Sequence, residues 1–319
     1  MTRLLDTPYE RNGLKLKNRV VMAPMTRSRA EGNLPNALMA EYYGQRAGAG
    51  LVISEGASPA PDGLGYARIP GIFNEAQAQG WGAIAKALHA GGSRLFIQIM
   101  HSGRVGATAN LPAGETLVGP SAIPAAGETW TDTAGMQPNA TPRAATAEDL
   151  VRLRQAHVEA ARLAVAHGVD GVELHGANGY LLGQFLNPRS NQRTDAYGGS
   201  IENRARFLVE VMAAVTAEIG ANKVGIRISP VSPVNDSNES QPQPLFEHVV
   251  REIAKFNPVY IHSTVGLGKS HLLNAIAWAA GAGDSSRNIV YLTADHFMYH
   301  FINAVQRQSA LAFKEWLRR

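Results

Sequence analysis

The chain has 319 residues, of which 45% are hydrophobic and 18% charged, and its net charge is +4. This length and hydrophobic content are enough for one large α/β domain or two smaller ones. This composition excludes a disordered, collagen-like or coiled-coil chain, and the absence of Cys excludes disulfides and cysteine-ligated zinc or iron–sulfur sites. No apolar run approaches the about 18–20 residues of a membrane span, and the N-terminal residues lack the apolar stretch of a signal peptide, so we expect a cytoplasmic protein.

Short runs of β-branched residues alternate with amphipathic stretches over the first two thirds of the chain. They predict strands at Val20–Met22, Leu51–Glu55, Leu95–Met100, Gly171–His175 and Val224–Ser229. They predict helices at Asn36–Arg46, Glu75–Ala90, Glu148–His167, Ile201–Ile219 and Leu245–Lys255. This alternation predicts a parallel sheet covered by helices. Two long polar stretches, 102–146 and 176–200, interrupt the pattern and are predicted as loops.

Polar residues follow the predicted strands where each one ends. Thr26 follows the first strand, Gln98 lies near the end of the third, and His175 and Arg227 lie near the ends of the next two. Polar groups at the carboxyl ends of successive strands are the active-site arrangement of a (β/α)₈ barrel of the TIM type. A doubly wound sheet also has its site at this edge, but at a single crevice. The number of contributing strands favours the barrel.

Three polar side chains lie just past a strand that is predicted to be buried: His175, Asn178 and Tyr180. His175 and Asn178 are hydrogen-bond donors, which can polarise a carbonyl oxygen and stabilise the enolate formed when a nucleophile adds at the β-carbon. Tyr180 has a phenolic proton that it can deliver to the α-carbon. A structural role for a single His at a strand end is the alternative, and the spacing does not decide between the two.

Six segments carry a family resemblance and occur in the same order as in that family. They are Val20–Arg27, Phe96–Arg104, Gly171–Leu182, Asn187–Asp195, Tyr197–Arg204 and Gly225–Pro230. Over about residues 4–255 the chain resembles the Old Yellow Enzyme family of flavin-dependent ene-reductases. The resemblance implies a (β/α)₈ barrel that holds FMN non-covalently. It also implies that NAD(P)H reduces the flavin, which then passes a hydride to the β-carbon of an α,β-unsaturated carbonyl compound.

The resemblance also implies roles for individual residues. The residues that would bind FMN are Pro24, Met25, Thr26, Ala57, Gln98 and Arg227. Of these, Ala57 and Gln98 would contact the isoalloxazine ring, and Arg227 would approach its N1/O2 edge. The catalytic residues would be His175 and Asn178, which bind the substrate oxygen, and Tyr180, which donates the proton. Without the resemblance, a structural role explains Gln98 and Arg227 better, namely a hydrogen bond that ties a loop or an ordinary ion pair.

The resemblance stops where the family's last two strands and its FMN phosphate site should follow. The chain has instead a strand at Tyr260–His262, a Gly-containing loop and a Gly-Lys-Ser sequence. This is the Walker A arrangement G-x-x-x-x-G-K-[ST], with Ser263 in place of the first Gly. Such a loop would bind phosphate, with the serine on Mg²⁺, through Gly266, Gly268, Lys269 and Ser270. A chance occurrence of Gly-Lys-Ser is the alternative.

Residues 257–319 resemble the P-loop region of the bacterial chromosomal replication initiator DnaA, a AAA+ ATPase. The matching pieces are Asn257–His262, Val265–Leu272, Val290–Ala294 and Ala312–Glu315. Because no acidic Walker B strand follows, we expect ATP and Mg²⁺ to be bound at most without turnover, and we expect no initiator activity. The excess of 6 basic over 3 acidic residues in 257–319 fits this inheritance better than a nucleic-acid partner of this chain.

The sequence therefore predicts a chimera of two parts. Residues 1–256 would form an oxidoreductase barrel without its last strands, and residues 257–319 would be the P-loop fragment, with the junction between Leu245 and Tyr260. A further strand at Ile289–Thr293 and helices at Asp295–Gln306 and Ala310–Leu317 leave the barrel about one βα unit short. The P-loop would follow a barrel strand on the face where FMN lies, so it could replace the missing phosphate site.

The predicted function is that of an FMN-dependent oxidoreductase that reduces small-molecule enones with NAD(P)H. The alternative is an inactive or flavin-poor chimera whose C-terminal P-loop binds a nucleotide or phosphate. Bound flavin that NADPH bleaches would favour the first, and ATP binding without flavin would favour the second.

Overall fold

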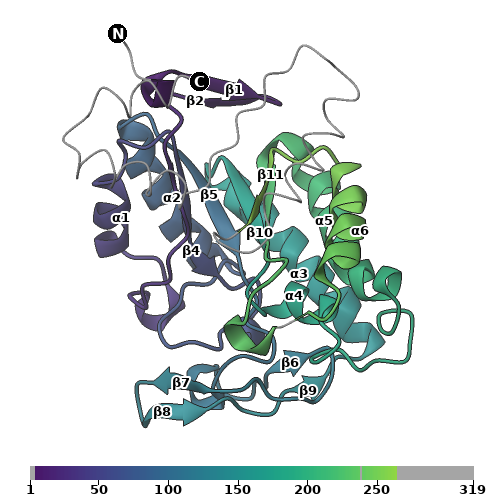
Figure 1. Ribbon diagram of the computed structural model, residues 1–319. Coiled ribbons are helices and arrows are strands. Elements are labelled where there is room, and N and C mark those ends of the chain that lie inside the picture. Colours follow the sequence, from purple (N-terminus) through teal and green to yellow (C-terminus); the bar gives the residue numbers. More distant parts are fainter. Residues whose placement is uncertain (1–3, 238, 264–319) are drawn as a thin grey trace, which may run out of the picture. The chain divides into compact units, whose positions relative to one another are not determined.

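The computed structural model describes residues 4–237 and 239–263 (Figure 1). Residues Met1–His262 form one compact unit. The predicted P-loop residues Gly266, Gly268, Lys269 and Ser270 lie outside the described residues. The same holds for the strand and the two helices predicted beyond residue 288.

A six-stranded sheet forms the centre of the described chain (Figure 1). Its strands are β3 (Val21–Met22), β4 (Leu51–Ala57), β5 (Arg94–Ile99), β10 (Gly171–Gly176), β11 (Val224–Ile228) and β12 (Tyr260–Ser263). They are neighbours in the order of the sequence, and the four pairings from β3 to β11 are parallel. A doubly wound sheet reverses its strand order at a switch point, and this sheet has no reversal. The predicted barrel-type α/β fold is confirmed in this form, as a curled parallel sheet that makes up part of a barrel.

The helices follow the strands as predicted. They are α1 (Ala37–Gly44), α2 (Glu75–Ala90), α3 (Ala147–Ala166), α5 (Ile201–Ile219) and α6 (Pro242–Ala254). The first four begin after a residue whose side chain accepts a backbone N–H of the first turn, namely Asn36, Asn74, Thr146 and Ser200. Helix α6 begins three residues earlier than predicted, with Pro242 in its first turn, where proline is favoured. Neighbouring helices pack on one another in sequence, from α1 to α6.

The two faces of the sheet have different compositions. On one face, side chains such as Ile97, Leu174 and Ile226 are fully buried among the helices. On the other face, near the amino ends of the strands, Ile53 and Phe96 form an apolar layer with Leu14, Leu16, Leu51 and Val259. Leu14 and Leu16 belong to a hairpin of β1 (Tyr9–Arg11) and β2 (Leu14–Leu16). The sequence pattern missed this hairpin because three-residue strands show too little alternation.

The two predicted long loops contain secondary structure, which corrects the prediction for both. Residues 102–146 contain two small sheets, of β6 (Val118–Gly119) with β9 (Arg143–Ala144) and of β7 (Glu128–Thr131) with β8 (Gly135–Pro138). Residues 176–200 contain α4 (Leu181–Leu186). Short 3₁₀ turns lie at Leu4–Asp6, Glu31–Asn33, Pro61–Gly63, Thr108–Asn110, Ala221–Lys223 and Val234–Asp236. In the part of the chain that is described, no helix is both long and apolar enough to span a bilayer.

Candidate active site

Polar side chains lie on three neighbouring strands, on the face of the sheet that also carries the apolar layer. They are nearer the carboxyl ends of the strands than that layer is. Gln98 on β5 is the Cα partner of Glu173 on β10, and His175 is the partner of Arg227 on β11. Because side chains alternate between the faces of a strand, Glu173 and His175 point to the same side. The sheet thus brings Gln98, His175 and Arg227 together, three of the residues that the sequence proposed.

Gln98 and Glu173 form a buried hydrogen-bonded pair. The Gln98 side-chain nitrogen Nε2 donates to Glu173 Oε1 over 2.7 Å, and the two residues are 3% and 0% exposed. Burial raises the pKa of Glu173 to about 7, although the Gln98 hydrogen bond and the Arg227 charge act in the opposite direction. Sequence reasoning assigned no role to Glu173. The available signal was an acidic residue inside the apolar strand Val172–Leu174.

Arg227 has a buried nitrogen without a partner in the part of the chain that is described. Its Nε–H is fully buried and donates to no acceptor among residues 4–237 and 239–263. Burial lowers the pKa of Arg227, while the nearby Glu173 charge favours the protonated form. A buried donor without an acceptor costs free energy, so its presence indicates a group that the described residues do not supply. The oxygen- and nitrogen-rich edge of a flavin ring is such an acceptor, and the residues present therefore fit FMN.

His175 is held as a neutral imidazole. Its Nδ1 accepts the backbone N–H of Ala177 over 3.3 Å, which leaves Nε2 as the nitrogen that carries the proton. Burial lowers the pKa of His175 to about 3, and the charges of Arg227 and His262 act in the same direction. The ring is therefore a neutral hydrogen-bond donor throughout the physiological pH range.

The turn after β10 places Asn178 and Tyr180 next to His175. The Asn178 N–H donates to Ser229 Oγ over 2.8 Å, and its C=O accepts from Asn235 Nδ2 over 2.9 Å. The Tyr180 ring lies 4.9 Å from the His175 ring, centroid to centroid. The proposed catalytic residues His175, Asn178 and Tyr180 therefore lie within one turn of the chain.

Sequence reasoning also missed Tyr66, which contacts Tyr180. The two phenolic oxygens are 3.1 Å apart, and the rings meet edge to face at 6.1 Å. Burial and the neighbouring Tyr180 raise the pKa of Tyr66, so it stays protonated. Nothing in the local sequence around Tyr66 indicates a partner 114 residues away.

The other predicted flavin contacts lie at the carboxyl ends of β3 and β4. Pro24, Met25 and Thr26 follow β3, where Met25 and Thr26 are exposed, and Ala57 is the fully buried last residue of β4. These residues are thus at the same ends of the strands as His175 and Arg227.

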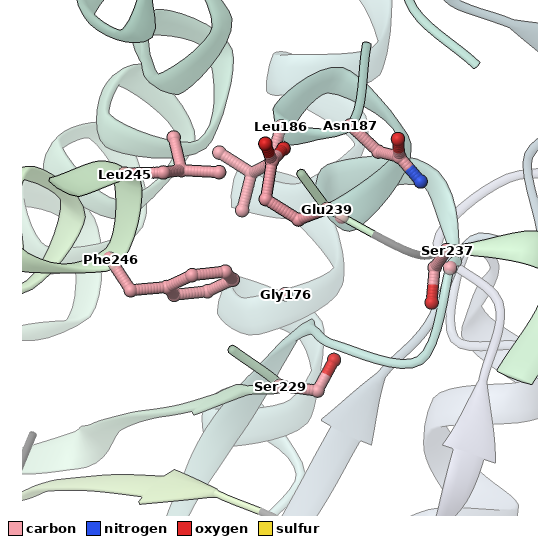
Figure 2. Close-up of a pocket in the computed structure, with 10 residues that line it drawn as sticks. Gly176, Leu186, Asn187, Ser229, Ser237, Glu239, Leu245 and Phe246 are labelled. Carbon is pink, nitrogen blue, oxygen red and sulfur yellow. The ribbon is translucent and has the colours of Figure 1, made fainter. Parts of the chain in front are cut away.

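A small pocket lies beyond the end of β10, between α4 and the start of α6 (Figure 2). It is lined by Gly176, Gly179, Gly183, Leu186, Asn187, Ser229, Ser237, Glu239, Leu245 and Phe246. The Glu239 carboxylate is paired with Arg204 over 2.8 Å and both are buried. None of the predicted site residues lines this pocket.

Among the described residues, no group of His, Asp and Glu could hold a metal ion.

Comparison with known proteins identifies the family. The model of the NADH:flavin oxidoreductase / NADH oxidase family matches residues 5–266. Flavin oxidoreductase hxnT of Emericella nidulans is 40% identical, covering 81% of this chain and 68% of that protein. 12-Oxophytodienoate reductase 1 of Oryza sativa subsp. japonica is 42% identical, covering 79% and 65%. A probable flavin mononucleotide-dependent alkene reductase of Leishmania infantum is 42% identical, covering 76% and 67%.

Solved structures give the same result. A morphinone reductase mutant in complex with tetrahydroNAD has a TM-score of 0.79 and 39% identity, covering 83% of this chain and 74% of that one. The Old Yellow Enzyme homologue from Zymomonas mobilis has a TM-score of 0.78 and 37% identity, covering 82% and 73%.

A second family model, of the bacterial DnaA ATPase domain, matches residues 242–319. The two matches overlap at residues 242–266. The chain spans about two thirds of the length of the curated relatives that it matches, from 65% to 68% for the three named above.

These comparisons confirm the resemblance to the Old Yellow Enzymes, and they support the oxidoreductase prediction over the alternative of a phosphate-binding chimera. The predicted enzyme class, the FMN cofactor and the NAD(P)H reductant are confirmed at the level of the family. The chain belongs to the NADH:flavin oxidoreductase / NADH oxidase family.

Proposed function

We propose that this protein reduces the carbon–carbon double bond of α,β-unsaturated carbonyl compounds with NAD(P)H. The observation that carries the proposal is the buried Nε of Arg227, which has no partner among the described residues. Arg227 is directly opposite His175 on the neighbouring strand, and Gln98 lies on the far side of that strand. Relatives named as a 12-oxophytodienoate reductase and an alkene reductase support the choice of substrate class.

The residues that would hold FMN are those at the carboxyl ends of β3, β4, β5 and β11. Pro24, Met25 and Thr26 would lie along the ring with Ala57, while Gln98 and Arg227 would face its polar edge. FMN, when bound, supplies the hydride chemistry. The positive charge of Arg227 would favour the anionic reduced form of such a ring.

The substrate oxygen would be held by His175 and Asn178. His175 offers its Nε2–H as a neutral donor, and the Asn178 side chain offers a second N–H group. Two donors at a carbonyl oxygen stabilise the negative charge that develops there as a hydride reaches the β-carbon. Tyr180 would then supply the proton to the α-carbon, which completes the addition of one hydride and one proton across the double bond.

A second candidate concerns the C-terminal segment, and the match of residues 242–319 to the DnaA ATPase domain favours it. We propose that residues 1–256 are an oxidoreductase barrel without its last strands and that residues 257–319 derive from a replication initiator. Gly266, Gly268, Lys269 and Ser270 would then bind a phosphate group, that of FMN or of a nucleotide, without ATPase or initiator activity.

A visible absorbance spectrum of the purified chain tests both candidates. We expect a flavin spectrum that NADPH bleaches under nitrogen and that an added enone restores. A colourless protein that binds no added flavin would overturn the main proposal, and ATP binding by such a protein would favour the second candidate. If the P-loop residues hold the phosphate of FMN, Lys269→Ala should weaken FMN but not riboflavin, and an equal effect on both would exclude that role.

A further inference from the structure

The buried pair of Gln98 and Glu173 sets the direction in which the Gln98 amide points. The two ends of a carboxamide differ, because the nitrogen donates hydrogen bonds and the oxygen accepts them. Glu173 Oε1 accepts from Gln98 Nε2 over 2.7 Å. Burial raises the pKa of Glu173 to about 7, and above that pH the carboxylate has no proton to donate. In this form Glu173 selects the nitrogen end of Gln98 and leaves the oxygen Oε1 for another partner.

The surroundings keep this pair in one place. Gln98 and Glu173 are directly opposite each other in the β5–β10 pairing, and the Gln98 backbone N–H is bound by Ser54 Oγ over 3.2 Å. The Tyr260 ring packs on Gly225, which is the Cα partner of Glu173, and a Cβ added at Gly225 would come within 2.3 Å of the ring. Glu173 is 0% exposed. A carboxylate held on rigid strands in this way can orient its neighbour with little loss of rotamer entropy.

The free end of Gln98 is an acceptor. Because Gln98 meets Glu173 through Nε2, the end of the amide that is left for a ligand is the oxygen Oε1. A ligand that meets Gln98 must therefore offer a donor. Arg227 lies on β11, with β10 between it and Gln98, and has a buried N–H without a partner among the described residues, so it requires an acceptor. The pyrimidine part of a flavin ring carries both kinds of group, an imide N–H flanked by carbonyl oxygens.

We propose that Glu173 is a positioning residue that orients Gln98 so that its carbonyl oxygen accepts the imide N–H of the flavin ring. Glu173 does not touch the ring itself and acts only through Gln98. This inference rests on the proposed function, because it needs a flavin at the site.

The test compares two phosphate-free flavins, lumiflavin and 3-methyllumiflavin, in which a methyl group replaces the imide hydrogen. Dissociation constants are measured by flavin fluorescence at pH 8.5, where Glu173 is ionised, on the full-length protein after its bound flavin has been dialysed away. The unaltered chain should bind lumiflavin about tenfold more tightly than the methylated ring, because one hydrogen bond to a buried acceptor is lost.

Glu173→Leu should reduce this affinity ratio towards one, because the released Gln98 amide turns and no longer distinguishes the two rings. Gln98→Leu should do the same, and the double variant should show no further change, since both changes remove the same interaction. Leu174→Val is the matched control, because Leu174 is fully buried on the other face of the same strand. It should lower stability and leave the ratio unchanged.

Glu173→Gln should give an intermediate ratio, because an amide at this position can either accept from Gln98 or donate to it. This variant decides the question if Glu173→Leu does not fold. If the affinity ratio stays at the wild-type value in Glu173→Gln and in any folded Glu173→Leu protein, the role of Glu173 is overturned, while the proposed function stands. If the unaltered chain binds neither flavin, the proposed function fails and the inference fails with it.

Discussion

The rings of His175 and Tyr180 lie 4.9 Å apart, with their planes at 65°. The two residues between Ala177 and Tyr180 explain the contact, because Asn178 and Gly179 both have positive φ angles, of 56° and 72°. Two left-handed residues in succession turn the chain sharply back on itself, and Asn and Gly are the residues that accept this conformation at least cost. The turn thereby brings a candidate proton donor onto a candidate carbonyl-binding group.

We expect Tyr180→Phe to slow enone reduction by about 10²–10⁴-fold, because it removes the proton for the α-carbon and keeps the ring that packs on His175. Reduction of the flavin by NADPH needs no such proton and should keep its rate. Stopped-flow measurement of the two half-reactions separates these effects. Tyr66→Phe is the control, since it removes the other hydroxyl of the 3.1 Å pair and should have a much smaller effect. An equal loss in both half-reactions of Tyr180→Phe would contradict the assignment.

We expect His175→Asn to lower the rate of enone reduction by about 10–10³-fold, because the shorter donor reaches the substrate oxygen less well. The pKa of His175 is lowered to about 3, mainly by burial, so the imidazole is neutral above that pH. The charged and titratable groups near it, Arg227, His262 and Tyr180, are present in both proteins. The ratio of the two rates should therefore be constant from pH 5 to pH 8. A ratio that changes around pH 6–7 would show that the imidazolium form takes part.

Glu173→Gln should change how stability depends on pH. The pKa of Glu173 is raised to about 7 in the folded protein, above its ordinary value of 4.5, so between these values the folded state binds more protons than the unfolded state. The wild-type free energy of unfolding therefore falls as the pH rises through this window, by up to about 3 kcal/mol from this group. Gln98, Arg227 and Tyr260 face the carboxyl group and are the same in both proteins.

The variant lacks this titration, so its stability relative to wild type should be more favourable at pH 8 than at pH 5. Urea unfolding at the two pH values measures the difference. The same stability difference at both values would mean that Glu173 is ionised throughout the range.

Gly225→Ala should destabilise the sheet interior. A Cβ at this position would come within 2.3 Å of the Tyr260 ring, which is packed in the apolar layer and cannot move away freely. Overpacking of this kind costs about 1–3 kcal/mol. Gly48→Ala is the matched control, because no atom lies within 4 Å of its added Cβ. Thermal unfolding should show a lower midpoint for Gly225→Ala only, and equal midpoints for the two variants would contradict the packing argument.

The sequence by itself determined the order of the central sheet strands and of the long helices that cover them, but not the β1–β2 hairpin, the small sheets or α4. The capping residues Asn74, Thr146 and Ser200 stand where helices α2, α3 and α5 begin, because a side chain that binds the first free N–H groups is a local signal. The strand ends near Gln98, His175 and Arg227 were also predictable from a local signal, because each is a short apolar run followed by polar residues. The motifs that resemble the Old Yellow Enzyme family then indicated flavin binding and enone reduction for the residues at those strand ends.

Only the tertiary structure decided which of these side chains meet and in what state. Glu173 lies 75 residues from Gln98, and Tyr66 lies 114 residues from Tyr180, so the register of the sheet and the path of the loops bring each pair together. The neutral state of His175 also depends on burial by the whole sheet and on the charge of Arg227. Hydrogen bonds across strands and the cost of burying charge depend on contacts that are remote in sequence, and no local pattern contains them.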